Sequence, residues 1–144
     1  MTQSLSATEA KPAEQKTEDQ ADPNDWPVIF AYTRAQAIED GVLVDVSDTA
    51  KEAGFRYPVA LTHAVYVQYV EVPEGVEGQD ESGRLWDILF MCGLKMRKTS
   101  GDRCFFELLV RNDNRRPQRV KLKAVCAGDD EGKPCITVMM PDED

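Results

Sequence analysis

The segment that most restricts the fold is a long apolar helix predicted near the middle of the chain. Asp80 or Ser82 is a suitable N-cap, and the helix is expected to run to about Lys98. One stripe at helical spacing consists of Leu85, Leu89, Cys92 and Met96, and most of the remaining circumference is covered by Trp86, Ile88, Phe90, Met91 and Leu94. A helix that is apolar nearly all round is buried on several sides, so we place it at the centre of the fold. A homodimer interface along the helix explains the surplus apolar face equally well.

Three apolar segments rich in strand-forming residues follow this helix and predict an antiparallel meander of strands over 104–110, 119–126 and 135–140. Turn-forming residues separate them at 112–117 and 128–132. Strand residues point alternately to the two faces of a sheet. The core-facing set of the second strand is therefore Val120, Leu122, Ala124 and Cys126, and the water-facing set is Arg119, Lys121 and Lys123.

Shorter elements are predicted before the long helix. Thr33 caps a helix over 34–40 that ends at Gly41, a short strand or extended stretch covers 42–46, and a second helix runs from Ser47 to Gly54. Segment 63–72 has apolar residues at helical spacing but is rich in β-branched residues, and we interpret it as a helix. The predicted fold class is α+β: short N-terminal helices and one central apolar helix packed on a C-terminal three-stranded antiparallel meander.

The charge of the chain divides it into a domain and two tails. The net charge is −9, but residues 1–25 carry six carboxylates against two lysines, and residues 142–144 are all acidic. Residues 1–25 also contain few large apolar side chains, so they cannot offset the entropy of ordering. We therefore predict a disordered acidic tail over 1–25, one domain over 26–141 and an acidic C-terminal tail over 142–144.

The sequence also argues against several classes of protein and site. No apolar run is long enough to span a membrane, and no secretory signal precedes the domain, so we expect a cytoplasmic protein. The four cysteines have no metal-ligand spacing and are interpreted as small packing residues. The acidic stretch 129–131 is interpreted as a solvated turn rather than a calcium loop. We predict no metal, no cofactor and no catalytic residue, and an enzyme is the less favoured class.

A basic hairpin is the first candidate binding site. Six cations lie within 13 residues and are opposed only by Asp113: Arg111, Arg115, Arg116, Arg119, Lys121 and Lys123. Such a patch can hold phosphates or an acidic protein surface. The alternative is a solvated sheet face, because no aromatic residue interleaves with these cations.

A polar cluster on the first helix and strand is the second candidate. Arg34 is expected to pair with Glu39 or to hold an anion, and Gln36 lies on the same helix. Asp45 lies between two valines and is read either as a partly buried carboxylate that needs a partner or as a cap for the helix that begins at Ser47. The structural alternative for the cluster is a helix held to the next strand by polar contacts.

Several long strings give the chain a resemblance to a known family. YTRAQAIEDGVLVDVS (32–47), GQDESGRLWDIL (78–89) and ITVMMPDED (136–144) resemble an uncharacterised family of small proteins, whose members are encoded mainly on bacterial plasmids, integrative elements and phages. The resemblance covers about residues 26–144. It implies a bacterial cytoplasm and an accessory gene of a mobile element, and it implies no activity for any residue.

Three functional hypotheses follow. The first is a non-catalytic accessory binding protein of a bacterial mobile element, which acts on a protein partner such as a host defence or maintenance factor. The second is a nucleic-acid-binding accessory protein that uses the basic hairpin. The third is a small nucleotide-processing enzyme, for which Arg34, Asp45 and His63, the only histidine, are the residues to test.

Overall fold

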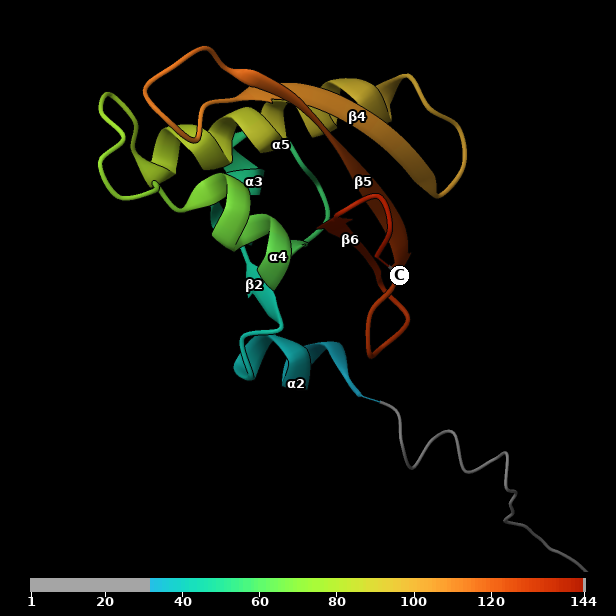
Figure 1. The fold of residues 1–144 in the computed structure, drawn as a ribbon. Coiled ribbons are helices and arrows are strands. Elements are labelled where there is room, and N and C mark those ends of the chain that lie inside the picture. The colour runs from blue at the N-terminus through green and yellow to red at the C-terminus, as the bar shows by residue number, and fades with distance from the viewer. Residues whose placement is uncertain (1–31, 144) are drawn as a thin grey trace, which may run out of the picture. The chain divides into compact units, whose positions relative to one another are not determined.

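Five strands form one sheet in the order β2–β3–β6–β5–β4 in the computed structural model of the chain (Figure 1). The structure describes residues 32–143, and residues 34–143 belong to one compact unit. The strands are β2 (Leu43–Asp45), β3 (Val59–Thr62), β4 (Arg103–Val110), β5 (Gln118–Gly128) and β6 (Pro134–Met139). The helical elements are α2 (Arg34–Glu39), α3 (Ser47–Glu52), α4 (His63–Val65), η2 (Tyr66–Val70) and α5 (Glu81–Arg97). The predicted disordered tail, 1–25, lies outside the described residues, as does the start of the predicted domain, 26–31.

The predicted meander is present, but it is only part of the sheet. β4, β5 and β6 pair in antiparallel order, as the three segments and the turns between them predict. β3 then lies parallel to β6, and β2 pairs antiparallel with β3. The prediction of a three-stranded sheet is therefore wrong in extent. β2 lies within the short extended segment predicted over 42–46, but nothing in its three residues indicates a place in the sheet. β3 has four residues and is buried almost throughout, so it does not show the alternation that marks a strand in sequence.

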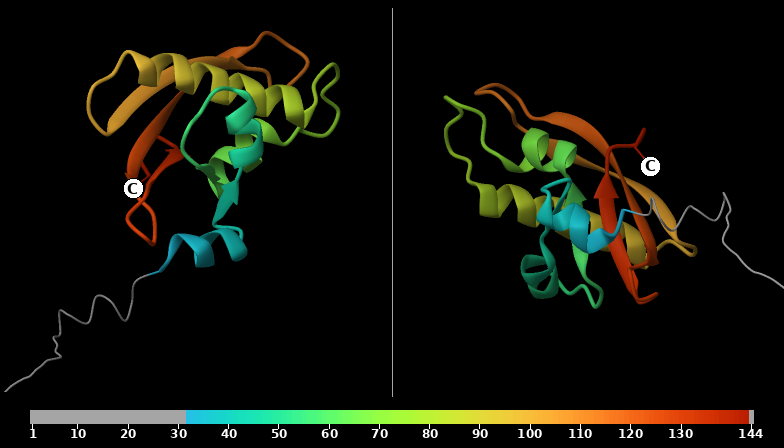
Figure 2. Two further views of the ribbon diagram at one scale, coloured as in Figure 1. Left: turned by 180° about the vertical axis from the view of Figure 1, so that it is seen from behind. Right: turned by 90° about the horizontal axis from the view of Figure 1, so that it is seen from below.

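One face of the sheet carries the hydrophobic core. The register aligns one apolar residue from each strand in a continuous row: Val44, Leu61, Val138, Ala124 and Cys104. Helices α3, α4, η2 and α5 add their buried side chains to this face, among them Ala50, Val65 and Ile88. Figures 1 and 2 show these helices gathered over the sheet. The other face is contacted by α2 and by the residues after β6, as described below.

The long helix α5 begins where the sequence predicts and is buried on one side only. Asp80 is its N-cap and accepts a hydrogen bond from the backbone N–H of Gly83 at 2.6 Å. Ile88, Leu89 and Cys92 are fully buried on the sheet. Trp86 and Phe90 are 39% and 48% exposed. The prediction of a helix buried on several sides is therefore wrong, because a helix on the face of a sheet leaves its opposite side uncovered.

Both short N-terminal helices end at the glycines that the sequence marks. Gly41 and Gly54 have φ angles of 80° and 99°, the left-handed region that glycine adopts without strain. Val42 N–H bonds the carbonyl of Ala37 at 2.9 Å and Phe55 N–H bonds that of Ala50 at 2.9 Å, which closes both helices in the same way. After these turns α2 is followed by β2 and α3 by β3. Both strands lie on the side of the sheet away from β4.

The ambiguous segment 63–72 is helical, but its second part has the wider π-helical turn. Thr62 caps α4 by accepting a hydrogen bond from Val65 N–H at 3.4 Å. The helix then continues as η2, which ends before Glu71. The helix prediction is confirmed, and the π-helical turn is a feature that hydrophobic spacing does not reveal.

Candidate functional site

Strand β4 presents a free backbone edge. It is the last strand of the sheet on its side, and no strand lies beyond it among residues 32–143. Cys126 N–H donates a hydrogen bond to the carbonyl of Asp102 at 2.7 Å. In an antiparallel pair, hydrogen-bonded and non-bonded residue pairs alternate, so this bond fixes which residues of β4 bond to β5. Even-numbered residues of β4 therefore bond to β5. The N–H and C=O groups of Arg103, Phe105, Glu107 and Leu109 point away from the sheet.

A groove runs along this edge beneath α5, and we call it the edge groove. It consists of two cavities of about 550 and 450 Å³ that share Met91 and Glu107 in their walls. β4 contributes consecutive residues 105–109, whose side chains alternate between the two faces of the sheet. Because side chains from both faces of β4 line the groove, the backbone edge of this strand lies in the groove.

Large apolar side chains border the edge groove and are exposed. Phe90 of α5 and Leu109 of β4 line the first cavity, and Phe105 lines the second. Phe105 is 41% and Leu109 61% exposed, and Trp86 lies one turn before Phe90 on α5. Contiguous apolar surface beside unpaired backbone groups is the arrangement that binds an added protein segment.

Charged side chains surround the apolar part of the groove. Arg119 Nη1 lies 3.8 Å from Glu107 Oε1, and the ammonium group of Lys121 lies 5.4 Å from the centre of the Phe105 ring. Lys95 of α5 and Lys98, the residue that caps the end of this helix, line the second cavity, and Asp87 lines the first. Cations outnumber carboxylates around the groove, and all of these groups are exposed.

The structure disperses the predicted basic hairpin instead of presenting it as one patch. Arg119 and Lys121 face outward beside the edge groove, as predicted. Arg111 turns back and donates hydrogen bonds to the backbone carbonyls of Glu77 and Asp113. Arg115 and Arg116 are exposed in the turn between β4 and β5. Binding of a ligand by these residues remains a prediction.

Lys123 contradicts the prediction that it faces water. Its residue is only 5% exposed, and its ammonium group donates a hydrogen bond to the backbone carbonyl of Glu143. The carboxylate of Glu143 accepts hydrogen bonds from Met140 N–H at 2.7 Å and from Thr62 Oγ1 at 2.8 Å. The chain after β6 thus folds over this face of the sheet and covers Lys123, which alternation within one strand cannot indicate.

The polar cluster of α2 and β2 is a set of structural contacts. Arg34 does not pair with Glu39 but donates to Thr137 Oγ1 at 2.7 Å and to the carbonyl of Ile136 at 2.9 Å, on β6. Asp45 is exposed and accepts hydrogen bonds from Ser47 N–H at 3.1 Å and Ser47 Oγ at 2.6 Å. Asp45 thus holds Ser47, the first residue of α3, but it is not the N-cap, which is Val46 without a side-chain cap. The reading of Asp45 as a partly buried carboxylate is wrong. Gln36 is exposed.

The turn between β5 and β6 holds the start of α2, a role that sequence reasoning missed. Asp130 accepts hydrogen bonds from Arg34 N–H at 2.8 Å and Ala35 N–H at 3.1 Å, the free donors of a first helical turn. Arg34, Asp45 and Asp130 line a cavity of about 330 Å³, which does not include His63. The three residues of the enzyme hypothesis therefore do not share this cavity.

Asp129, next in the same turn, organises the turn itself. Its Oδ1 accepts hydrogen bonds from the backbone N–H groups of Glu131 and Lys133, each at 2.9 Å. These two bonds favour the ionised carboxylate and lower the pKa of Asp129 from its ordinary value of 3.8.

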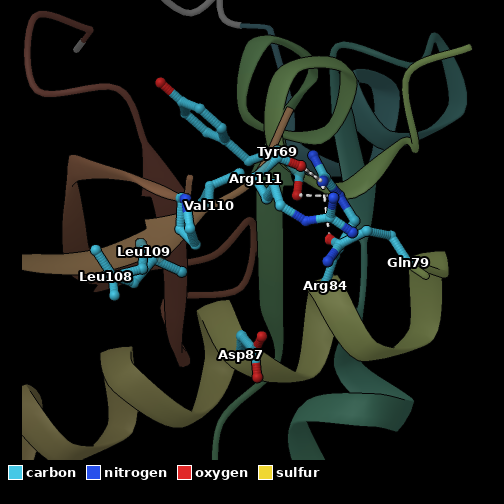
Figure 3. A pocket seen from close by; sticks show the side chains of 9 residues that line it. Tyr69, Gln79, Arg84, Asp87, Leu108, Leu109, Val110 and Arg111 are labelled. Atoms are coloured by element: carbon cyan, nitrogen blue, oxygen red, sulfur yellow. Dashed lines mark hydrogen bonds between the residues drawn. The ribbon is translucent and has the colours of Figure 1, made fainter. Parts of the chain in front are cut away.

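Arg84 is the second feature that sequence reasoning missed. It is 5% exposed, and Figure 3 shows it inside the molecule beside a cavity of about 220 Å³. It donates to the carbonyls of Tyr69 at 3.0 Å, Arg111 at 2.7 Å and Gln68 at 3.4 Å, and its other contacts are the side chains of Gln79 and Asn112. Burial lowers the pKa of Arg84. All of its donors are used within the protein, so Arg84 joins η2, α5 and β4 and leaves no donor for a ligand.

The cysteines agree with their interpretation as packing residues. All four are free; Cys92, Cys104 and Cys135 are buried, and Cys126 is half-buried. Burial raises the pKa of Cys92 to about 12 and also raises the pKa values of Cys104 and Cys135. Among residues 32–143, no three His, Cys, Asp or Glu side chains gather as a set of metal ligands.

Comparison with known proteins places the chain in a family. The sequence model of DUF6573, a family of unknown function, matches residues 24–144. The chain belongs to the DUF6573 family. No curated protein and no solved structure matches it. Within the described part of the chain, every helix is too short or too polar to cross a bilayer. The family match begins at residue 24, close to the predicted start of the domain at 26.

Proposed function

We propose that this protein is a non-catalytic accessory protein of a bacterial mobile element, and that it acts by binding another protein chain in the edge groove. A host defence or maintenance factor is the class of target that we favour. One observation carries the proposal. The exposed side chains of Phe90 and Leu109 lie on either side of a strand whose outward backbone groups have no partner strand in the described chain.

The physical reason is that exposed apolar side chains beside an unpaired strand edge cost free energy in water until another segment covers them. An open, apolar edge strand without proline tends to pair with another chain, and natural proteins usually protect such edges with bulges or covering segments. A bound strand satisfies the outward N–H and C=O groups, and its side chains bury the apolar walls of the groove. The composition of the groove walls also favours binding over catalysis, because they contain no histidine, cysteine or serine.

The basic residues support the nucleic-acid alternative less well. Lys123 is covered, Arg119 lies near Glu107, and Arg111 holds a neighbouring loop. Arg115 and Arg116 remain exposed to solvent in the turn between β4 and β5. If the nucleic-acid hypothesis holds, reversal of both charges should abolish salt-sensitive gel shifts. If our proposal holds, the same reversal should leave protein binding in the edge groove unchanged.

The test is a capture experiment with matched variants. The full chain is immobilised and exposed to lysate of the bacterial host, and the same is done with Phe90→Ser combined with Leu109→Ser. Tyr57→Ser is the control, because Tyr57 is 43% exposed and lines neither cavity of the groove. We expect one protein to be retained by the wild type and by the control and lost by the double variant. Retention by all three proteins, or by none, contradicts the proposal, provided that all three melt at similar temperatures.

A further inference from the structure

We infer that the edge groove accepts a second copy of this chain, through antiparallel pairing of β4 with β4 across a two-fold axis at Phe105. This inference goes beyond the proposed function, because the second copy would occupy the same groove as the foreign protein and the two would compete for it. Pairing of this kind would join the two five-stranded sheets into one. The argument depends on which residues of β4 bond outward, on their charges and on the position of α5.

The outward-bonding residues restrict the register of such a pair. Arg103, Phe105, Glu107 and Leu109 carry the free N–H and C=O groups, so they must lie opposite one another in bonded pairs. When Phe105 lies opposite Phe105 of the second copy, Arg103 lies opposite Glu107 of the second copy, and the reverse pair follows from symmetry. This register combines an aromatic pair with two pairs of opposite charge, all on one face of the sheet.

Neighbouring registers lack this complementarity. An axis at Glu107 places two Glu107 carboxylates directly opposite each other, and like charges in that position destabilise a strand pair. An axis at Phe106 places Phe105 opposite Glu107 and Arg103 opposite Leu109, so neither charge finds an opposite charge. The sequence of β4 is therefore self-complementary in the register with its axis at Phe105, and this complementarity is the argument for a second copy.

The position of α5 completes the interface. A two-fold axis perpendicular to the sheet keeps the same face of both sheets on the same side, so the two copies of α5 come to lie next to each other. Phe90 and Leu94 line the edge groove from α5. They would be the side chains between the two helices, which accounts for an apolar face on α5 that its own sheet does not bury.

The first part of the test is the mass of the full chain in solution at high micromolar concentration, measured by sedimentation equilibrium. We expect a dimer. In Arg103→Glu, the new carboxylate would lie opposite Glu107 of the second copy, so the dimer dissociation constant should rise roughly tenfold. Arg116→Glu, in the exposed turn, is the matched control and should leave the constant unchanged.

The second part tests the register by disulfide formation under mild oxidation. Bonded antiparallel pairs have Cα atoms about 5.5 Å apart, within the range of a disulfide. Phe105→Cys should cross-link with itself, and Arg103→Cys should cross-link with Glu107→Cys only when the two variants are mixed. Leu109→Cys is exposed but lies away from the axis, and like the wild type it should not cross-link.

Two outcomes would overturn the inference. One is a monomeric mass at the highest concentration, and the other is a dimer in which position 105 does not cross-link with itself. A monomer whose groove captures a foreign protein would refute self-pairing and leave the proposed function standing. A dimer with the predicted cross-links whose double groove variant still captures the same foreign protein would refute the proposed function alone.

Discussion

Arg84 Nη1 donates a hydrogen bond to the backbone carbonyl of Arg111 at 2.7 Å, and this bond joins the start of α5 to the end of β4 (Figure 3). The same guanidinium group also bonds the carbonyl of Tyr69, near the end of η2. One buried side chain thus holds three elements that are separate in sequence. The edge groove lies between two of them, α5 and β4, so its geometry depends on this contact.

Replacement of Arg84 should destabilise the whole fold. Arg84→Met would leave several buried carbonyl oxygens without donors, and we expect a loss of about 3 kcal/mol in the free energy of unfolding. Arg84→Lys should recover only part of this loss, because a compact ammonium group cannot reproduce the spread of the guanidinium donors. Urea denaturation checks both, with Arg116→Met as the exposed control. An unchanged midpoint for Arg84→Met would contradict the structural role of Arg84.

Glu143 should contribute to stability although it lies near the end of the chain. Its carboxylate accepts hydrogen bonds from Met140 N–H and Thr62 Oγ1 and so ties the segment after β6 to β3. Glu143→Ala is expected to cost about 1–2 kcal/mol in the free energy of unfolding. Asp142→Ala, at an exposed neighbour, is the control and should change little. Equal effects of the two substitutions would show that the loss comes from charge alone.

The turn at Asp129 should give a stability contribution that depends on pH. The pKa of Asp129 is lower in the folded chain than its ordinary value of 3.8, because the N–H groups of Glu131 and Lys133 favour the carboxylate. A depressed pKa stabilises the folded state above the ordinary value, and this contribution is lost as the pH falls through the folded pKa. Asp129→Asn should therefore lower Tm at neutral pH, and the difference from the wild type should shrink as the pH falls below 3.8.

Thermal melts over an acidic pH series measure this effect. Glu131→Gln is the control, because Glu131 contacts Lys133 only as an exposed ion pair at 3.4 Å and should show no comparable trend. A Tm difference for Asp129→Asn that stays constant down to the most acidic pH would contradict ionisation as its cause.

The four thiols should differ in reactivity. Burial raises the pKa of Cys92 to about 12, so little thiolate forms at mildly alkaline pH, whereas Cys126 is only half-buried. We expect one fast reaction with a disulfide reagent in the native state and three more thiols only after unfolding. Cys126→Ser should remove the fast phase. A fast phase that persists in this variant would place the accessible thiol elsewhere.

Local chemistry made much of the secondary structure predictable. Gly41 and Gly54 end helices because their left-handed backbone is easy only for glycine, and Asp80 begins a helix because its side chain reaches the free N–H of Gly83. The alternation in β5 likewise gives its core-facing residues correctly, since Leu122 and Ala124 are fully buried. Each of these signals depends on a few neighbouring residues, so it survives in any fold that the chain adopts.

Contacts between distant segments explain the failures. Lys123 looked like a solvent-facing strand residue, but Glu143 covers it. The residue pattern of the long helix gives Arg84 no role, but carbonyl oxygens from η2 and from the end of β4 surround it. In both cases the burial of a cation depends on a segment that is remote in sequence, and no periodicity within the strand or the helix reports it.

The sequence alone determined where most helices and the three C-terminal strands form and how their apolar residues alternate, because caps, glycines and spacing act within a few residues. Tertiary structure alone decided that β3 lies parallel to β6, that β4 is left at the edge, and that α5 is buried on one side. Strand order follows from the pairing of remote segments into one shared core. The exposed edge of β4, and with it the candidate binding surface, is a consequence of that order.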